Sequence, residues 1–313
     1  MSVAFIYPGQ GSQNVGMGSE IAKAFSSARE VFEEIDDALN QNLSKLMFEG
    51  PEEDLILTQN AQPAIMAVSL AVMRVLSVEG GINLSKSATC VAGHSLGEYS
   101  ALAASGCFEV SETARLLKTR GLAMQEAVPI GKGGMAAIVG LDLEEIVSIA
   151  SEAAEDGVCE AANDNAPGQV VISGEIAAIN RAIELAKKRG AKRAINLPVS
   201  APFHCSLMES AAGVMSNELT SVNMSELKVP FVSNVTANIV NDIEEIKKLL
   251  VEQVTGMVRW RESVLTMKSI GVDNLVEIGV GKVLSGLVRR IDKDLRIIQA
   301  GTPESIEELL KNI

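Results

Sequence analysis

Short apolar runs alternate with longer stretches of helical periodicity along most of the chain. The apolar runs predict buried strands, and the stretches with an apolar residue every three or four positions predict helices that pack against them. Strands that alternate with helices in this way are typical of an α/β domain with a mainly parallel sheet. The expected elements are a strand at Val3–Tyr7, helices at Glu20–Asn40 and Ala61–Val78, a strand at Ala88–Ala92, helices at Leu96–Ser105 and Glu112–Ala127, a helix from Ser206, a strand at Val229–Ser233, a helix at Ile243–Gln253 and a strand at Asn274–Glu277.

The middle of the chain predicts a different order of elements, β-α-β-β-α-β. This order is that of the ferredoxin-like unit. We therefore expect residues 133–198 to form an inserted ferredoxin-like subdomain, and residues 1–132 and 199–313 to form the large α/β domain. The expected elements of the insert are a strand at Gly134–Leu141, a helix at Leu143–Ala154, strands at Val158–Asn163 and Gln169–Ser173, a helix at Ile176–Arg189 and a strand at Lys192–Pro198.

The composition limits the classes of function. Of the 313 residues 47% are apolar, and the formal net charge is −13. A nucleic-acid-binding surface needs a concentrated positive stripe, and the chain has only short basic clusters, so no nucleic-acid partner is expected. The clusters are either solvated helix ends or a docking surface for an acidic partner. They are Lys187-Lys188-Arg189, Lys192-Arg193 and Arg289-Arg290.

The cysteines and the N-terminus predict a reduced, cytoplasmic protein. The four cysteines, at positions 90, 107, 159 and 205, form no CxxC or CxxH pair, so neither a metal site nor a disulfide scaffold is expected. The first residues lack the basic segment and the long apolar core of a signal peptide. Arg74 interrupts the best candidate for a membrane span, so no span is expected.

Gly93-His94-Ser95-Leu96-Gly97 is the most specific chemical pattern in the chain. This G-x-S-x-G sequence follows a predicted strand and precedes a predicted helix, which is the setting of a nucleophile elbow. A serine on such a sharp turn has strained backbone angles and projects its hydroxyl into a cleft, and the flanking glycines let neighbouring backbone approach closely. We therefore expect Ser95 to be a nucleophile.

A serine nucleophile needs a base, and the chain has only two histidines. His94 adjoins Ser95 on the turn, where neighbouring side chains diverge, so a structural role is expected for it. His204 follows Pro202 in the loop just after the insert and is the expected base. No acidic residue between 95 and 204 lies in an obvious strand-end loop of the large domain, and Asp164 falls in the insert. Because the second ring nitrogen needs only an acceptor, we favour a Ser–His dyad.

Two further segments hold candidate binding groups. The loop Pro8-Gly9-Gln10-Gly11-Ser12-Gln13 follows the first strand, and it is either a connecting turn or, through the Gln10 amide beside the Leu96 amide, a pair of donors for an oxyanion. Arg120 lies in the helix expected at Glu112–Ala127. By position alone its side chain is either a surface group or a buried guanidinium that binds a carboxylate. The apolar side of that helix is expected to hold Leu116, Leu117, Leu122 and Met124.

Five motifs occur in an order that closely resembles the malonyl-CoA:acyl-carrier-protein transacylases of bacterial fatty acid synthesis. The resemblance runs from about residue 3 to residue 290, which is nearly the whole chain. It implies a hydrolase-like α/β domain that carries a ferredoxin-like subdomain. The motifs are Pro8-Gly9-Gln10-Gly11-Ser12-Gln13, Gly93-His94-Ser95-Leu96-Gly97-Glu98, Arg120 with Met124-Gln125-Glu126-Ala127-Val128-Pro129, Pro167-Gly168-Gln169-Val170-Val171-Ile172, and Ala201-Pro202-Phe203-His204.

The resemblance also implies a role for each candidate residue. Ser95 takes the malonyl group as an ester, and His204 is its base, oriented by a backbone carbonyl. Gln10 and Leu96 supply the oxyanion-hole amides, and Arg120 pairs with the free malonyl carboxylate. The implied partners are malonyl-CoA and holo acyl carrier protein. No metal or redox cofactor, no nucleic acid and no membrane is expected, and the enzyme is expected to be a monomer.

One position departs from the family pattern, and two other classes of function stay open. Related enzymes have Gln before the Trp of a later motif, where this chain has Arg259. The change is harmless if only the backbone carbonyl at this position holds His204, and it alters the dyad if the side chain does. A serine hydrolase would share the elbow but would not depend on Arg120. A carrier-binding module without catalysis would form no adduct at Ser95.

Overall fold

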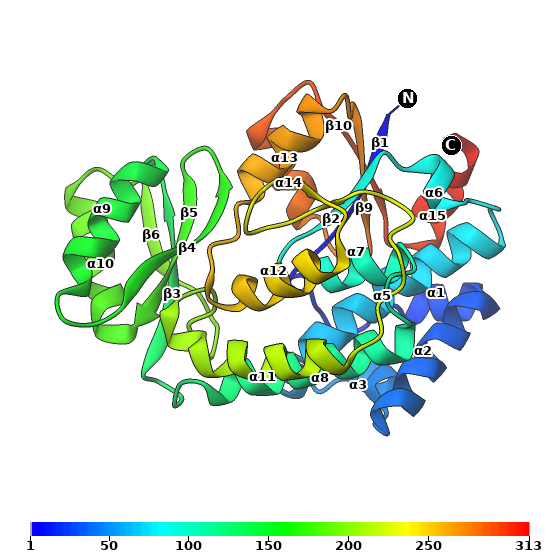
Figure 1. Cartoon of the computed structure of the whole chain (residues 1–313), viewed down its shortest axis with the longest axis horizontal. Helices are drawn as coiled ribbons and strands as arrows, with labels where there is room; N and C mark the ends of the chain where they lie inside the picture. The colour runs from blue at the N-terminus through cyan, green and yellow to red at the C-terminus, as the bar shows by residue number, and fades with distance from the viewer. Residues whose placement is uncertain (1, 313) are drawn as a thin grey trace.

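Two β-sheets organise the molecule, and the chain passes from the larger to the smaller and back (Figure 1). The computed structural model describes residues 2–312. The larger sheet has the strand order β10-β9-β1-β2-β7-β8, and its neighbours run parallel except for the pair β7 and β8. Its strands are β1 (Val3–Tyr7), β2 (Cys90–Gly93), β7 (Phe231–Val232), β8 (Ile239–Val240), β9 (Asn274–Ile278) and β10 (Arg296–Ala300).

Both faces of the larger sheet are covered, as a parallel sheet requires. Alternate residues of β1 enter different cores: Phe5 and Tyr7 pack with the long helix α5, whereas Ala4 and Ile6 pack with α13 and α14. The helices of this part are α1 (Ser19–Ala24), α2 (Ser26–Leu39), α3 (Leu43–Glu49), α4 (Glu52–Leu55), α5 (Thr58–Val78), α6 (Leu84–Ser87), α7 (Gly97–Ala104), α8 (Val110–Glu126), α11 (Glu209–Ser221), α12 (Ile243–Thr255), α13 (Trp260–Ser269), α14 (Val283–Ile291) and α15 (Pro303–Asn312), with a 3-10 turn at Ser206–Met208.

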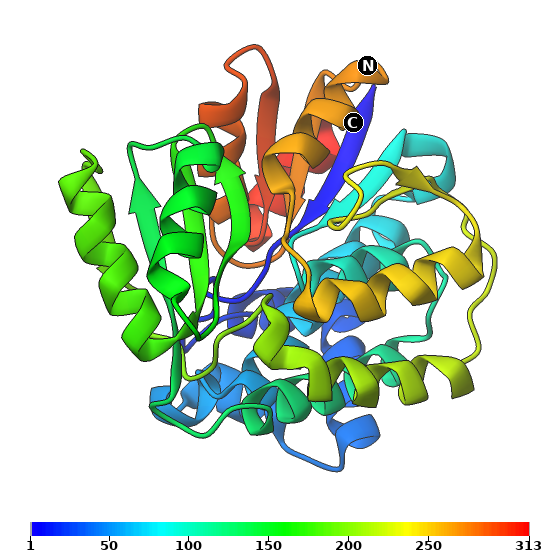
Figure 2. The same ribbon diagram turned by 60° about the vertical axis from the view of Figure 1, so that its left-hand side comes forward.

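The smaller sheet is antiparallel and carries two helices on one face (Figures 1 and 2). Its strand order is β4-β5-β3-β6, and both this order and the element order are ferredoxin-like, as the sequence predicts. The expected fold class is therefore confirmed, whereas domain limits at residues 133 and 198 stay a prediction. The elements are β3 (Gly133–Val139), α9 (Leu143–Ala154), β4 (Cys159–Ala166), β5 (Gln169–Glu175), α10 (Ile176–Lys188) and β6 (Arg193–Asn196).

Some local details differ from the expectation. The single helix expected at Glu20–Asn40 is two helices, because Phe25 takes an extended conformation, φ −127° and ψ 122°, between α1 and α2. Leu122 is not on the buried side of α8 but 39% exposed, since at 3.6 residues per turn it projects about opposite the buried Met124. The sequence pattern does not predict β8, β10, α3, α4, α6, α13, α14 or α15.

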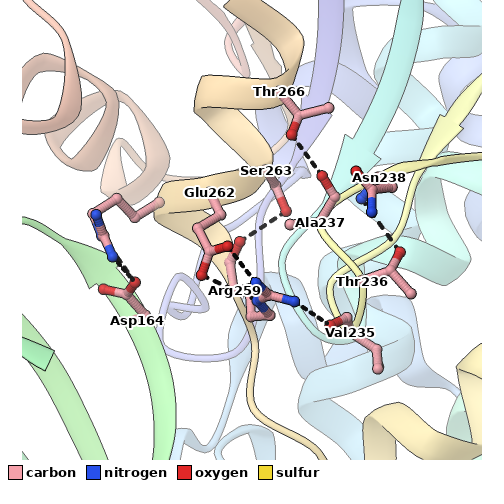
Figure 3. Close-up of polar contacts among 10 residues, drawn as sticks. Asp164, Val235, Thr236, Ala237, Asn238, Arg259, Glu262, Ser263 and Thr266 are labelled. Carbon is pink, nitrogen blue, oxygen red and sulfur yellow. Dashed lines mark hydrogen bonds and ion pairs between the residues drawn. The ribbon is translucent and has the colours of Figure 1, made fainter. Parts of the chain in front are cut away.

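Strand β4 anchors the smaller sheet to the larger part of the molecule. Asn163 bridges Val258, the Asp164 amide donates to the Val258 carbonyl (2.9 Å), and the Val258 amide donates to the Ala162 carbonyl (2.9 Å). The buried Asp164 carboxylate also pairs with Arg261 of α13 at 2.8 Å, and Figure 3 shows Asp164 reaching from its strand toward that helix. These contacts fix the smaller sheet beside the carboxyl-terminal half of the larger part.

Helix α5 is long and apolar. Among residues 2–312 it is the one helix whose length and hydropathy suit a membrane span, and 83% of its most apolar window is buried inside the molecule. It packs against α2 and α8. The core helix of a globular domain passes the same test of length and composition.

Candidate active site

Ser95 lies on the turn between β2 and α7, at the carboxyl end of a central strand of the larger sheet. Its backbone φ of 53° falls in the left-handed region, which residues other than Gly, Asn and Asp seldom adopt. A Cβ on Gly93 would lie 1.9 Å from the backbone of Gly97, and a Cβ on Gly97 would lie 2.3 Å from the Tyr7 carbonyl oxygen. Only glycine fits at both flanks, so this local sequence folds as an elbow.

Asn234 holds the elbow from the neighbouring strand. It follows β7, its Oδ1 accepts a hydrogen bond from the Ser95 amide (2.8 Å), and its Nδ2 donates to the Gly93 carbonyl (2.7 Å). The residue is fully buried, so both bonds form away from water. A strained backbone persists only where its surroundings over-determine it, and these bonds together with the close glycine contacts do so for Ser95.

His204 reaches Ser95 from the loop that precedes α11. Its Nε2 lies 2.8 Å from Ser95 Oγ, and its Nδ1 lies 2.7 Å from the backbone carbonyl oxygen of Gln253. Because a carbonyl can only accept, Nδ1 carries the ring proton and Nε2 is left to accept the Ser95 proton. Burial, and then the charge of Arg120, lower the pKa of His204 to about 3, so the ring is neutral at neutral pH.

Arg120 of α8 is buried beside Ser95, so the surface alternative for this residue is wrong. The residue is 1% exposed. Its Nη1 donates to Gln62 Oε1 (2.7 Å), and its Nη2 donates to Gln253 Oε1 (2.8 Å) and to Ser95 Oγ (3.3 Å). A guanidinium has five N–H donors, and Arg120 Nε has no partner within the part of the chain that the structure describes. The site therefore holds a fixed cation with unused donors next to the serine hydroxyl.

A second buried titratable group, Glu98 of α7, lies close by. Its Oε1 accepts from the Asn234 amide (2.6 Å) and its Oε2 accepts from Gln253 Nε2, which also donates to the Ser95 carbonyl (2.9 Å). Burial raises the pKa of Glu98 to about 8, and the two N–H donors and Arg120 oppose that rise. Gln253 of α12 thus contacts three groups of the site: His204 through its backbone, and Arg120 and Glu98 through its side chain.

The loop after β1 lies against the elbow. A Cβ on Gly9 would lie 2.7 Å from the His94 carbonyl oxygen, so the loop comes too close to the elbow for any residue other than glycine. Within residues 2–312 the amide N–H groups of Gln10 and Leu96 make no hydrogen bond, whereas the Gln10 side chain donates to Thr58 Oγ1 (3.4 Å). Both amides are therefore unengaged, and their role as oxyanion donors stays a prediction.

His94 turns toward the smaller sheet. Its Nε2 lies 2.9 Å from Asn165 Oδ1 on β4, and its ring lies 5.7 Å from the ring of Trp260. Burial lowers the pKa of His94, although the Asn165 hydrogen bond opposes that effect. The arrangement links the elbow to β4 and agrees with the structural role expected for this residue.

Arg259 is not the residue that holds the histidine. Its amide donates to the Asn234 carbonyl (3.0 Å), and its guanidinium pairs with Glu262 and points toward the Val235 carbonyl (Figure 3). The carbonyl that accepts from His204 belongs instead to Gln253, near the end of α12. The departure at position 259 therefore leaves the histidine contact unchanged.

Known proteins similar to this chain carry names that agree with one another. Residues 4–300 match the family described as "Acyl transferase domain". The malonyl CoA-acyl carrier protein transacylase of Bacillus subtilis is 43% identical over 312 residues, which cover 99% of this chain and 97% of that protein. This chain belongs to the malonyl CoA-acyl carrier protein transacylase family.

Solved structures of this transacylase family share the fold over the full length. The acyl-carrier-protein S-malonyltransferase of Bartonella henselae is 54% identical, with a TM-score of 0.97 and coverage of 100% of this chain and 99% of that chain. A malonyl-transacylase solved in complex with a type II PKS acyl-carrier protein is 41% identical, with a TM-score of 0.97 and coverage of 100% of both chains. The resemblance inferred from the five motifs is therefore confirmed.

Sequence reasoning misses Gln62, Glu98, Asn234 and Gln253. For Arg120 the sequence left a surface and a buried position open, although one signal favoured the buried position. Arg120 lies four residues after Leu116 and three after Leu117, so the helical period places it on their buried face. Gln62 gave a similar signal, as a polar residue inside an apolar helix. Nothing local marks Gln253 or Asn234, because the partners of their side chains lie more than 100 residues away in the chain.

Proposed function

We propose that this chain transfers the malonyl group from malonyl-CoA to the phosphopantetheine thiol of acyl carrier protein, through a malonyl ester on Ser95. The observation that carries the proposal is a buried cation at the serine: Arg120 Nη2 lies 3.3 Å from Ser95 Oγ, which lies 2.8 Å from His204 Nε2. The serine and histidine support acyl transfer. The cation supports an acyl group that ends in a carboxylate.

In the first half-reaction His204 Nε2 accepts the Ser95 Oγ proton while Oγ attacks the thioester carbonyl. The Gln253 carbonyl, which accepts from His204 Nδ1 at 2.7 Å, stabilises the imidazolium that forms. The amides of Gln10 and Leu96 donate to the oxyanion of the tetrahedral intermediate. The C–S bond then breaks, and His204 returns its proton to the departing coenzyme A sulfur.

In the second half-reaction the carrier thiol takes the place of coenzyme A. His204 accepts the thiol proton as the sulfur attacks the ester carbonyl, and the same amides hold the second oxyanion. The bond between the acyl carbon and Ser95 Oγ breaks, and Oγ recovers its proton from the imidazolium. The reaction is ping-pong, and each step uses only protons and electron pairs supplied by the two thiols and the dyad.

Arg120 would hold the free malonyl carboxylate. Gln62 and Gln253 fix the guanidinium from the two sides, so little side-chain entropy is lost when the carboxylate binds. A fixed acyl chain also leaves water poorly placed to attack the ester. This favours transfer to a thiol over the hydrolysis expected of a serine hydrolase.

The carrier would dock with its acidic surface against basic side chains of this chain. In the basic cluster at Lys187–Arg193, Lys187 pairs with Glu184 and Arg189 pairs with Glu145 and Glu152. The attraction would therefore come mainly from Lys188, Lys192 and Arg193, which form no ion pair among residues 2–312. The segment at Lys187–Arg193 is our proposed docking surface. We further propose that the enzyme acts as a cytoplasmic monomer.

Intact-protein mass spectrometry tests the proposal. Wild-type protein mixed with malonyl-CoA should gain one malonyl group, Ser95→Ala should gain none, and holo carrier protein should remove the group and become malonylated. A serine hydrolase would instead release malonate without carrier, and a binding module would show no adduct. Either result would contradict the proposed transfer.

A further inference from the structure

The orientation of the Gln253 side-chain amide is determined by its neighbours. The guanidinium of Arg120 can only donate, so the atom that faces it at 2.8 Å is the carbonyl oxygen Oε1. The Ser95 carbonyl can only accept, so the atom that faces it at 2.9 Å is Nε2, and the same Nε2 donates to Glu98. The amide dipole therefore lies between a buried anion and a buried cation, with its positive end toward the anion.

We propose that Glu98 is a positioning residue for acyl-group selection, which keeps Gln253 Oε1 turned toward Arg120 and so keeps the guanidinium aimed at the acyl group on Ser95. The inference rests on the proposed function, because it concerns the choice of malonyl over acyl groups without a carboxylate. Glu98 touches neither the serine hydroxyl nor the ring of His204 in any contact between described residues, and it acts only through Gln253 and Asn234.

The surroundings of Glu98 are those of an ionised acceptor. Each of its two oxygens faces an N–H group, from Asn234 on one side and Gln253 on the other. The residue is fully buried, so water cannot replace either donor. Burial is the largest influence on Glu98 and raises its pKa to about 8, whereas the two oriented donors and the charge of Arg120 favour the ionised form. The hydrogen-bond geometry decides between the two forms. A neutral carboxyl would need an acceptor for its proton where these contacts supply only donors.

An isosteric amide at this position cannot satisfy both donors. In Glu98→Gln one of the two terminal atoms is an NH2 group, which must face either the Asn234 amide or Gln253 Nε2. The Asn234 amide belongs to the backbone and cannot turn, whereas the Gln253 side chain can rotate. The mismatch therefore passes to Gln253. Either its Nε2 meets the new NH2 group, or the amide turns and places its NH2 group against Arg120 and its oxygen against the Ser95 carbonyl. Both arrangements displace the Gln253 side chain from the position that holds Arg120.

Loss of the Glu98 charge and loss of the Gln253 orientation should change the preference for malonyl in opposite directions. The anion of Glu98 repels a malonyl carboxylate through space, so removal of the charge alone would favour malonyl. Removal of the orientation disfavours malonyl, because a displaced guanidinium no longer meets the carboxylate. Glu98→Asp separates the two effects, since it keeps the charge but shortens the reach toward Gln253.

The experiment measures kcat/KM for loading of Ser95 from malonyl-CoA and from acetyl-CoA, by rapid quench and intact mass. We expect Glu98→Gln to lower the malonyl-to-acetyl ratio at least tenfold, and Glu98→Asp to lower it by a smaller factor. The matched control is Glu277→Gln. Glu277 is also a fully buried glutamate, but it accepts from Leu284 and Ser285 at the start of α14, away from Ser95. We expect the control to lower the melting temperature and leave the ratio within about twofold of wild type.

The outcomes separate this inference from the proposed function. If wild-type protein takes no malonyl from malonyl-CoA, the proposed function fails. If wild type loads malonyl and Glu98→Gln leaves the ratio unchanged or raises it, or lowers both rates equally, the positioning role is overturned. Should Glu98→Gln fail to fold, Glu98→Asp decides, and an unchanged ratio in that variant overturns the role.

Discussion

Mild acid is a direct test of the environment of His204. Burial first, and then the charge of Arg120, bring its pKa to about 3, against 6.5 for an unperturbed histidine. The difference between those values corresponds to on the order of 5 kcal/mol in favour of the neutral ring. At about pH 5.5 an unperturbed histidine would be only about one-tenth neutral, whereas His204 stays almost fully neutral.

As far as it depends on His204, the rate of serine loading should therefore be insensitive to pH in this range. His204, as the base of the free enzyme, keeps its lone pair between about pH 7.5 and about pH 5.5, so we expect kcat/KM for acetyl loading to change less than about twofold. Malonyl loading also depends on Glu98, whose pKa of about 8 lies close to this range, so a larger fall of the malonyl rate alone reports on Glu98 and not on His204. Rapid quench and intact mass measure the rate, and acetyl loading is the control that does not use Arg120 to hold a carboxylate. A tenfold fall of both rates over this range would refute the pKa assigned to His204.

The same pKa has a consequence for stability. The folded-state pKa lies below the unfolded value of 6.5, so the unfolded chain binds the proton first and stability is lost as the pH falls from about 6.5 toward 3. Between about pH 7.5 and about pH 5.5 this residue accounts for a loss of about 1.4 kcal/mol, which His204→Asn should remove. Urea unfolding of both proteins at the two pH values measures the difference, and equal losses would contradict a buried neutral ring.

Two further substitutions test the carboxylate contact and the elbow. Arg120→Ala removes charge-assisted hydrogen bonds worth about 1.5–3 kcal/mol each. Malonyl kcat/KM should therefore fall about 100- to 10,000-fold and far more than acetyl kcat/KM, and equal losses would count against a carboxylate-binding role. Gly93→Ala places a methyl group 1.9 Å from the Gly97 backbone and should leave little folded protein, as measured by soluble yield and circular dichroism. Its control is Gly213→Ala in α11, where an added Cβ meets nothing within 4 Å; this change should raise stability by about 0.5–1 kcal/mol. A similar outcome for both glycines would rule out the steric explanation.

The sequence predicts the fold class because both sheets have regular signals. The strand at Val3–Tyr7 and the β-α-β-β-α-β order of the insert are visible as apolar runs and helical periods, and the structure has both. The edges of the larger sheet are not predicted, because β8 is only Ile239–Val240 and β10 alternates exposed with partly buried residues. A strand this short, or this open to solvent, has too few apolar positions to stand out from a loop.

The sequence likewise predicts some residues of the candidate site and not others. Ser95 can be identified from a local motif, and His204 can be identified because the chain has only two histidines. The residue that accepts the hydrogen bond from His204 cannot be identified from the sequence. The acceptor is the backbone carbonyl of Gln253, and every residue type has such a carbonyl. The pairing of Gln253 with Glu98 depends on how α12 and α7 are placed relative to each other, which tertiary packing sets and no local pattern predicts.

Because the smaller sheet is inserted between residues of the candidate site, it also separates those residues in the order of translation. Ser95 and Arg120 lie before β3, whereas His204 and Gln253 lie after β6. A nascent chain on the ribosome that has completed the smaller sheet holds a serine without its imidazole, and it still lacks β9, which pairs with β1 in the middle of the larger sheet. Under the proposed Ser–His mechanism such an intermediate does not react with thioesters. The proposed mechanism therefore predicts that the growing polypeptide consumes no acyl-CoA until most of its length has been translated.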